Sequence, residues 1–71
     1  MDITYIKQTI APGIGKIYWF HCISVGGREF DIALTSAGNL REASAIFYTL
    51  GKPVRDEAVR SCRDMLKKMK K

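Results

Sequence analysis

The residues that could do chemistry are concentrated in five consecutive positions, 18–22, which hold three aromatic residues, the only histidine and one of the two cysteines. A histidine beside a cysteine is the pair that activates a thiolate nucleophile. In an extended strand, however, neighbouring side chains point to opposite faces, so His21 and Cys22 are not expected to meet. We therefore expect no catalytic residues and a protein that is not an enzyme.

Metal binding and export are also unsupported by the sequence. A structural zinc site needs about four ligands, usually in close pairs, whereas Cys22 and Cys62 are far apart and His21 is alone. The first ten residues lack the apolar run of a secretory signal, and no segment approaches the ~20 apolar residues of a membrane-spanning helix. We expect a cytoplasmic protein with two reduced thiols, no metal and no cofactor.

Two glycine-containing turns divide the first half of the chain. Pro12-Gly13 suits a type II turn, and Gly26-Gly27 suits a two-residue hairpin turn. Runs rich in β-branched and aromatic residues lie around these turns, at residues 3–10, 16–25 and 28–35. The sequence therefore predicts an antiparallel three-stranded meander.

The second half has the spacing of helices. Asn39 and Glu42 are separated as in a capping box, and an apolar stripe follows as far as Gly51. A second, clearly amphipathic helix is predicted from about Pro53 to Met69. The expected fold is α+β with the order β-β-β-α-α, in one small domain that covers residues 1–71. The stripe of the first helix consists of Leu40, Ala43, Ile46, Phe47 and Leu50.

A two-residue turn would also set which side chains share a face of the sheet. It places Trp19, His21 and Ile23 on the apolar face that the helices should cover. Trp19 is then a core residue, and His21 is a hydrogen-bonded structural histidine. Tyr18 and Phe20 point the other way, toward solvent.

Exposed aromatic residues beside Lys16 have three interpretations. They could stack unpaired bases, as on the sheets of RNA-binding domains. They could anchor a protein interface, where Tyr and Phe are enriched. Alternatively, the first strand, the N-terminus or a second subunit covers them. Glu29 and Asp31 on the same face would repel phosphate, which favours a protein partner over nucleic acid.

The net charge of +5 is located at the end of the chain. Residues 1–59 contain six basic and six acidic side chains, whereas residues 60–71 contain six basic side chains and Asp64. Cations near a helix C-terminus complement the helix dipole, but they could also bind a nucleic-acid backbone or an acidic protein surface. The predicted partner-binding residues are Tyr18, Phe20, Lys16, Arg60, Arg63, Lys67 and Lys68.

The order of strand, glycine turn, strand and helix resembles the arm-binding domains of tyrosine integrases and the second half of double-stranded RNA-binding domains. Those domains place basic residues at the helix start, whereas AGNLREA at residues 37–43 is neutral. In size and lack of motifs the chain resembles small phage proteins that block host machinery, including anti-CRISPR proteins. The resemblance implies an inhibitor.

We therefore expect a small, non-enzymatic interaction protein that occludes a surface of a partner protein. The alternative is a weakly specific nucleic-acid-binding module that uses the basic C-terminal helix and the sheet aromatics. A homodimer is compatible with either function, and neither a membrane nor a small-molecule substrate is expected as a partner.

Overall fold

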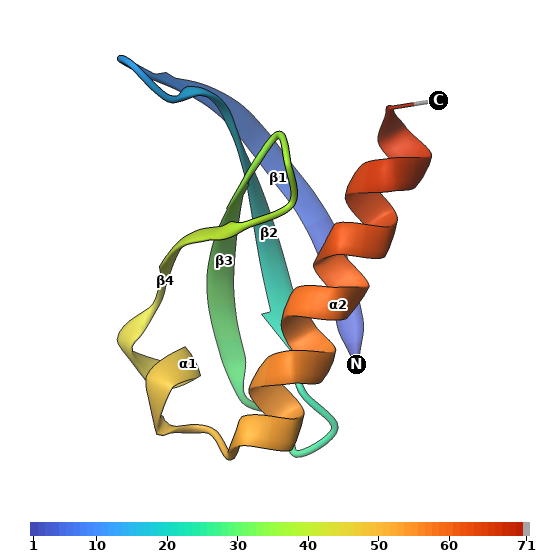
Figure 1. Cartoon of the computed structure of the whole chain (residues 1–71). Helices are drawn as coiled ribbons and strands as arrows, with labels where there is room; N and C mark the ends of the chain where they lie inside the picture. Colours follow the sequence, from blue (N-terminus) through green and yellow to red (C-terminus); the bar gives the residue numbers. More distant parts are fainter. Residues whose placement is uncertain (71) are drawn as a thin grey trace.

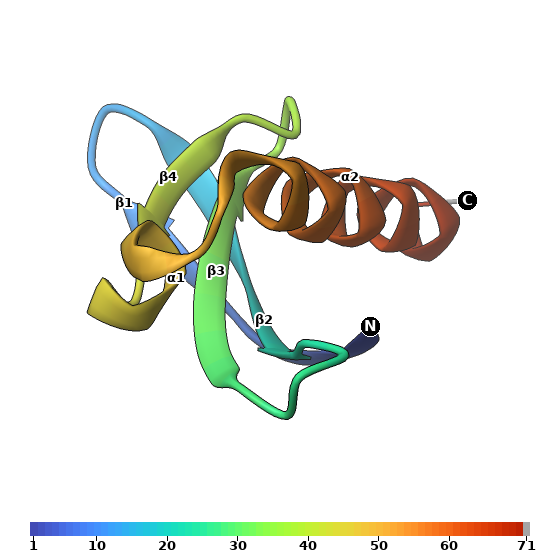
Figure 2. The ribbon, with the colours of Figure 1, turned by 90° about the horizontal axis from the view of Figure 1, so that it is seen from below.

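A four-stranded antiparallel sheet followed by two helices forms the fold (Figure 1), and the computed structural model describes residues 1–70 of the chain. The strands lie in chain order across the sheet, and α2 lies to one side of it (Figure 2). The predicted α+β class is confirmed, but the prediction of three strands is wrong by one. The elements are β1 (Asp2–Ala11), β2 (Gly15–Ile23), β3 (Glu29–Thr35), β4 (Leu40–Ala43), α1 (Ala45–Thr49) and α2 (Lys52–Met69).

The β1–β2 hairpin closes with the predicted type II geometry. Gly13 has a φ of +78°, and the N–H of Ile14 donates to the carbonyl oxygen of Ala11 over 3.0 Å. Further along the hairpin the register shifts between Tyr5 and Lys7, which forms a bulge in β1. The tip of this hairpin projects beyond the helices (Figure 1).

The β2–β3 hairpin has a three-residue loop instead of the predicted two-residue turn. The N–H of Ser24 donates to the carbonyl oxygen of Arg28, and the N–H of Gly27 donates to that of Ser24, each over 2.9 Å. Gly27 has a φ of +81°, whereas Gly26 is not in the left-handed region. A primed two-residue turn needs a positive φ at its glycine positions, so one left-handed glycine favours the longer loop.

The extra loop residue shifts the pairing of β2 with β3 by one position. The structure pairs Cys22 with Phe30 and Phe20 with Ile32, where a two-residue turn would pair Ile23 with Phe30. A one-residue shift exchanges the two faces of a strand relative to its neighbour. The predicted assignment of the faces of β2 is therefore wrong.

The β3–β4 hairpin repeats the same loop and replaces the start of the predicted first helix. The N–H of Thr35 donates to the carbonyl oxygen of Asn39, the N–H of Gly38 donates to that of Thr35, and Gly38 has a φ of +86°. Residues 40–43 therefore pair with β3, and the capping box predicted from Asn39 and Glu42 does not form. The first helix is shortened to α1, whose Phe47 is buried.

The core lies between one face of the sheet and α2, and we call this the covered face. The predicted helix from about Pro53 to Met69 is confirmed, with Ala58, Cys62 and Leu66 as its fully buried residues. Successive turns of the helix bring these residues to the same side. The covered face contributes Tyr18, Phe20 and Cys22 of β2, and Phe30, Ile32 and Leu34 of β3.

In the part of the chain that the structure describes, no helix combines the length and apolar character that crossing a bilayer requires.

Candidate functional site

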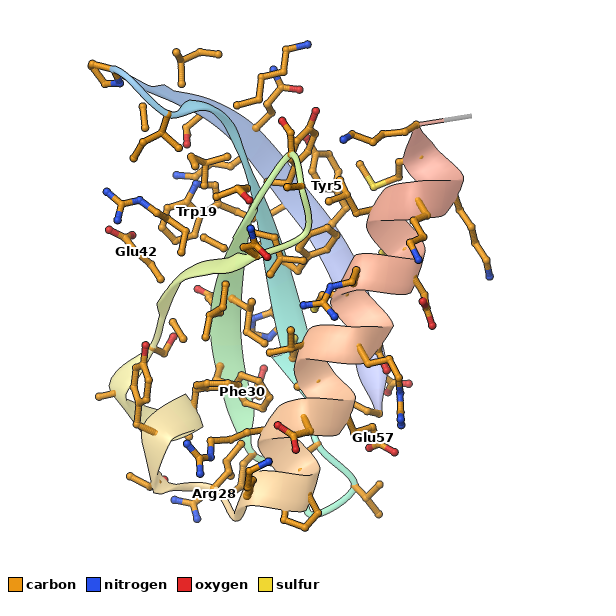
Figure 3. All side chains as sticks on the ribbon, in the orientation of Figure 1. Tyr5, Trp19, Arg28, Phe30, Glu42 and Glu57 are labelled. Carbon is orange, nitrogen blue, oxygen red and sulfur yellow. The ribbon has the colours of Figure 1, made fainter. Side chains whose placement is uncertain are left out.

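The two aromatic residues predicted as exposed anchors lie in the core. Phe20 has no exposed surface and Tyr18 is only 8% exposed. The ring of Phe20 contacts Tyr5 of β1 edge-on, with centroids 5.8 Å apart, and Tyr5 lies between the sheet and α2 (Figure 3). The expectation that Tyr18 and Phe20 are solvent-exposed is wrong, because the three-residue loop turns their side of β2 toward α2.

No helix within residues 1–70 covers the other face of the sheet, and we call it the open face. It carries Trp19 and His21, the two residues predicted to be inside. The strand pairing places acidic residues on this face from three strands, so its charge is opposite to the net charge of the chain. The open face consists of Asp2, Thr4, Lys7, Thr9, Ile17, Trp19, His21, Ile23, Glu29, Asp31, Ala33, Thr35 and Glu42.

Trp19 lies at the centre of the open face and is half-buried. Its indole N–H donates to Oγ1 of Thr9 over 2.9 Å, and the Nζ of Lys7 lies 5.7 Å from its ring centroid. Ile17 and Ala33 flank Trp19 in the register and are almost fully buried, although no described helix covers them. The indole is the large side chain placed to shield them, so Trp19 forms a fixed apolar patch on an otherwise polar face.

His21 lies between two carboxylates of β3. Its Nδ1 is 2.7 Å from Oδ1 of Asp31, and its Nε2 is 3.0 Å from Oε1 of Glu29. Carboxylates only accept hydrogen bonds, so both nitrogens must carry a proton if both contacts are hydrogen bonds. The hydrogen bond with Asp31, followed by that with Glu29, raises the pKa of His21 above its ordinary value of 6.5.

The position of Asp31 depends on the residue that precedes α1. The backbone N–H of Asp31 donates to Oγ of Ser44 over 2.8 Å, and the N–H of Ser44 donates to the carbonyl oxygen of Asp31 over 3.0 Å. The hydroxyl of Ser44 therefore holds the strand and does not cap α1. This reciprocal pair ties β3 to the start of α1 beside the carboxylate that binds His21.

The basic residues of the C-terminal segment, Arg63 of the predicted set and also Lys70, do not all face solvent freely. Nε of Arg63 donates to the carbonyl oxygen of Gly38 over 2.9 Å, and Nζ of Lys70 donates to that of Ser36 over 2.6 Å. Both side chains thus attach α2 to the β3–β4 loop. Lys70 also lies 5.8 Å from the ring centroid of Tyr18. The hydrogen bond to Gly38 gives Arg63 a structural role.

The remaining predicted basic residues are exposed. Arg60, Lys67 and Lys68 lie on α2, which packs against the covered face, so their charges are on the side of the molecule away from the open face. Lys16 is exposed near the tip of the β1–β2 hairpin, where it pairs with Ile10. The structure therefore separates the basic residues of α2 from the open face.

Sequence reasoning missed Trp19, His21, Glu42 and Lys7 as surface residues of one face. A serine or threonine three positions before a glycine could have revealed them, because this spacing indicates a three-residue loop and the loop length sets which side chains share a face. It occurs as Ser24 with Gly27 in one hairpin and recurs in the next, and it marks both three-residue loops.

Across residues 1–70 the surface has no pocket, and no group of three or more His, Cys, Asp or Glu side chains is arranged to hold a metal ion. Comparison with protein-family models, with curated proteins and with solved structures found no match.

Proposed function

We propose that this protein acts without catalysis, by binding a positively charged surface of a partner protein through the open face. The observation that supports this function is a half-buried tryptophan on an uncovered sheet face that also carries acidic residues from three strands. A central aromatic residue with a polar rim is the arrangement found in protein interfaces. A phage-type inhibitor that occludes host machinery would act in this way.

The charges on the open face support a basic partner. The strand pairing places four acidic residues on this face, Asp2, Glu29, Asp31 and Glu42, and two basic ones, Lys7 and His21. Complementary charge at the rim of an interface steers association and selects the partner. The same carboxylates would repel the phosphates of nucleic acid, so the alternative function would depend on the exposed basic residues of α2 alone.

The sheet supplies a rigid support for this surface. The indole of Trp19 is held by Thr9 and the carboxylate of Asp31 by His21, so two contact groups are fixed before any partner arrives. Preorganised side chains lose little conformational entropy on binding. The open face can therefore bind as it stands, without rearrangement of the fold.

Two exposed glutamates provide a matched test of the binding surface. Glu42 lies on the side of the sheet away from α2, whereas Glu57 lies on α2 itself (Figure 3). Partners retained from a host lysate by the immobilised wild-type protein would be identified by quantitative mass spectrometry, then purified. Their affinities would be measured for the wild type and for each variant.

We expect Glu42→Lys to weaken binding about tenfold or more, and Glu57→Lys to leave it within about threefold. Trp19→Ala should weaken it about 30-fold, as loss of a central aromatic residue does. Circular dichroism of each variant checks the fold. A double variant, Lys67→Glu with Lys68→Glu, would be measured in the same way. Equal losses of affinity in both glutamate variants, or a loss of affinity in the lysine double variant alone, would show that the open face is not the binding surface.

A second measurement tests the nucleic-acid alternative. Fluorescence anisotropy with single- and double-stranded oligonucleotides at about 50 and 200 mM salt should show no binding by the wild type. Oligonucleotide binding that weakens steeply with salt, and that disappears in the double variant Lys67→Glu with Lys68→Glu, would establish the alternative function instead. Size-exclusion chromatography in the same buffers shows whether a second copy of the chain is the partner.

A further inference from the structure

The two cysteines, far apart in the sequence, meet in the centre of the core. Cys22 of β2 and Cys62 of α2 have no exposed surface, and their Sγ atoms are 3.5 Å apart. Cys22 lies on the covered face opposite Phe30, and Cys62 lies one turn from both Ala58 and Leu66. The two free thiols thus contact each other where α2 packs on the sheet.

The contact is polar as well as steric, because each thiol is a weak donor and a weak acceptor. A hydrogen bond from Cys62 lowers the pKa of the Cys22 thiol. The same hydrogen bond, followed by burial, raises the pKa of the Cys62 thiol. When one thiol ionises, the other can donate a hydrogen bond to the thiolate, and each sulfur faces the other.

We infer that Cys22 and Cys62 form a modification site, at which a hydroperoxide oxidises the two thiols to a disulfide that links β2 to α2. This inference is independent of the proposed binding function. Hydrogen peroxide is a suitable oxidant because it is little larger than water and reaches buried groups through local opening, whereas a bulky disulfide reagent needs an exposed thiol.

The reaction balances in two steps. The Cys22 sulfur attacks one oxygen of hydrogen peroxide, the O–O bond breaks, and the departing hydroxide leaves as water with the Cys22 proton, which gives a sulfenic acid. The Cys62 sulfur then attacks the Cys22 sulfur, the S–O bond breaks, and a second water leaves with the Cys62 proton. The thiols lose two electrons, and the peroxide gains them.

The disulfide would link β2 to the middle of the buried side of α2. Cys62 is the central one of the three buried residues of α2, between Ala58 and Leu66. The sulfurs must approach from 3.5 Å to about 2.05 Å, which small side-chain and helix shifts can provide. The cross-link closes a long loop in the unfolded chain, so the oxidised form should resist unfolding better than the reduced form.

Intact mass spectrometry tests the modification directly. The folded wild-type protein would be treated with hydrogen peroxide, quenched with catalase, denatured and alkylated with N-ethylmaleimide. We expect a monomer that has lost two hydrogen atoms and takes up no maleimide, and that dithiothreitol returns to a doubly alkylated form. Cys22→Ala and Cys62→Ala should never lose two hydrogen atoms as monomers.

Urea unfolding of the oxidised and reduced forms tests whether the disulfide stabilises the fold. The midpoint of the oxidised protein should lie about 2 to 3 M above that of the reduced protein. A chain with both cysteines alkylated after peroxide, a sulfinic acid without a disulfide, a disulfide-linked dimer, or an unchanged or lower urea midpoint would each overturn the inference.

Discussion

His21 is the residue of the open face whose pKa is raised, by its hydrogen bonds with Asp31 and then Glu29. Its two nitrogens face Asp31 and Glu29, and neither carboxylate can donate a hydrogen bond in its ionised form. The protonated imidazole therefore satisfies both contacts and offsets negative charge on the face. When His21 loses its proton, the open face becomes more negative, so binding of a basic partner should strengthen as the pH rises through this pKa.

The pKa of His21 can be measured by NMR titration of its ring protons. We expect a value above 6.5 in the folded protein, with a larger decrease in Asp31→Asn than in Glu29→Gln, because the hydrogen bond with Asp31 is the main cause of the shift. A raised folded pKa means that the cluster contributes its full stability below about pH 6.5 and loses it as the pH rises through the folded value.

The stability test of this cluster follows the urea midpoint between about pH 5 and 9. The wild type should lose stability across the titration of His21, and His21→Gln should show a flatter profile over the same range. A folded pKa at or below 6.5, or an equal effect of both carboxylate variants, would contradict the assigned hydrogen bonds.

At the scale of elements, the two similar hairpin loops differ in what surrounds their glycines. Gly27 has a φ of +81° with open space where a Cβ would lie, whereas Gly38 has a φ of +86° and its Cβ would meet Cγ of Arg63 at 3.1 Å. Arg63 is fixed there by its hydrogen bond to the Gly38 carbonyl oxygen. The β3–β4 loop is thus clamped by α2, and the β2–β3 loop is free.

This difference gives a matched pair of alanine variants. Gly27→Ala should cost about 1 kcal/mol, the strain of a left-handed residue alone. Gly38→Ala carries the same strain and must also displace Arg63, so we expect about 2 to 3 kcal/mol. Urea unfolding measures both, and Arg63→Ala combined with Gly38→Ala should reduce the second cost. Equal costs for the two single variants would show that α2 does not clamp the loop.

The elements that depend on local pattern could be predicted from the sequence. The apolar stripe and Pro53 were enough to predict α2, and Pro12-Gly13 was enough to predict the first turn. The strand at residues 40–43 could not be predicted from the sequence. Leu40 and Ala43 have helical spacing, but so short a segment also fits an edge strand with a bulge. The pairing with β3 that follows the preceding loop selects the strand instead of the helix. This pairing is a tertiary contact, so the local sequence pattern does not reveal it.

The candidate site could not be predicted, because it depends on one residue in a loop. Every side chain of β2 changes face when the loop after it gains a residue, so Tyr18 and Phe20 exchange places with Trp19 and His21. Both faces of this strand carry aromatic residues, and hydrophobic alternation alone did not choose between them. Gly26-Gly27 suits either loop, and Ser24 was the residue that distinguished them.

At the scale of the whole molecule, the fold separates opposite charges and has one small core. The acidic open face and the exposed basic residues of α2 lie on different sides of the sheet. A chain of 71 residues has a net stability of only about 3 to 5 kcal/mol from such a core. A single large cavity is therefore enough to unfold it.

Phe20→Ala tests the core and the strand register together. Removing a fully buried phenylalanine costs about 3 to 5 kcal/mol, so we expect a largely unfolded chain at 25 °C. Val25 is the matched control, since a two-residue turn would put it on the covered side, whereas in the structure it is 90% exposed. Val25→Asp should therefore fold with a urea midpoint close to that of the wild type.

Far-UV circular dichroism and the dispersion of amide NMR signals measure both variants. The two possible registers predict opposite results, because each places one of these residues in the core and the other in solvent. A folded Phe20→Ala with an unfolded Val25→Asp would show that β2 turns its other face to α2. Trp19 and His21 would then be covered by the helix, and the open face could not be the binding surface.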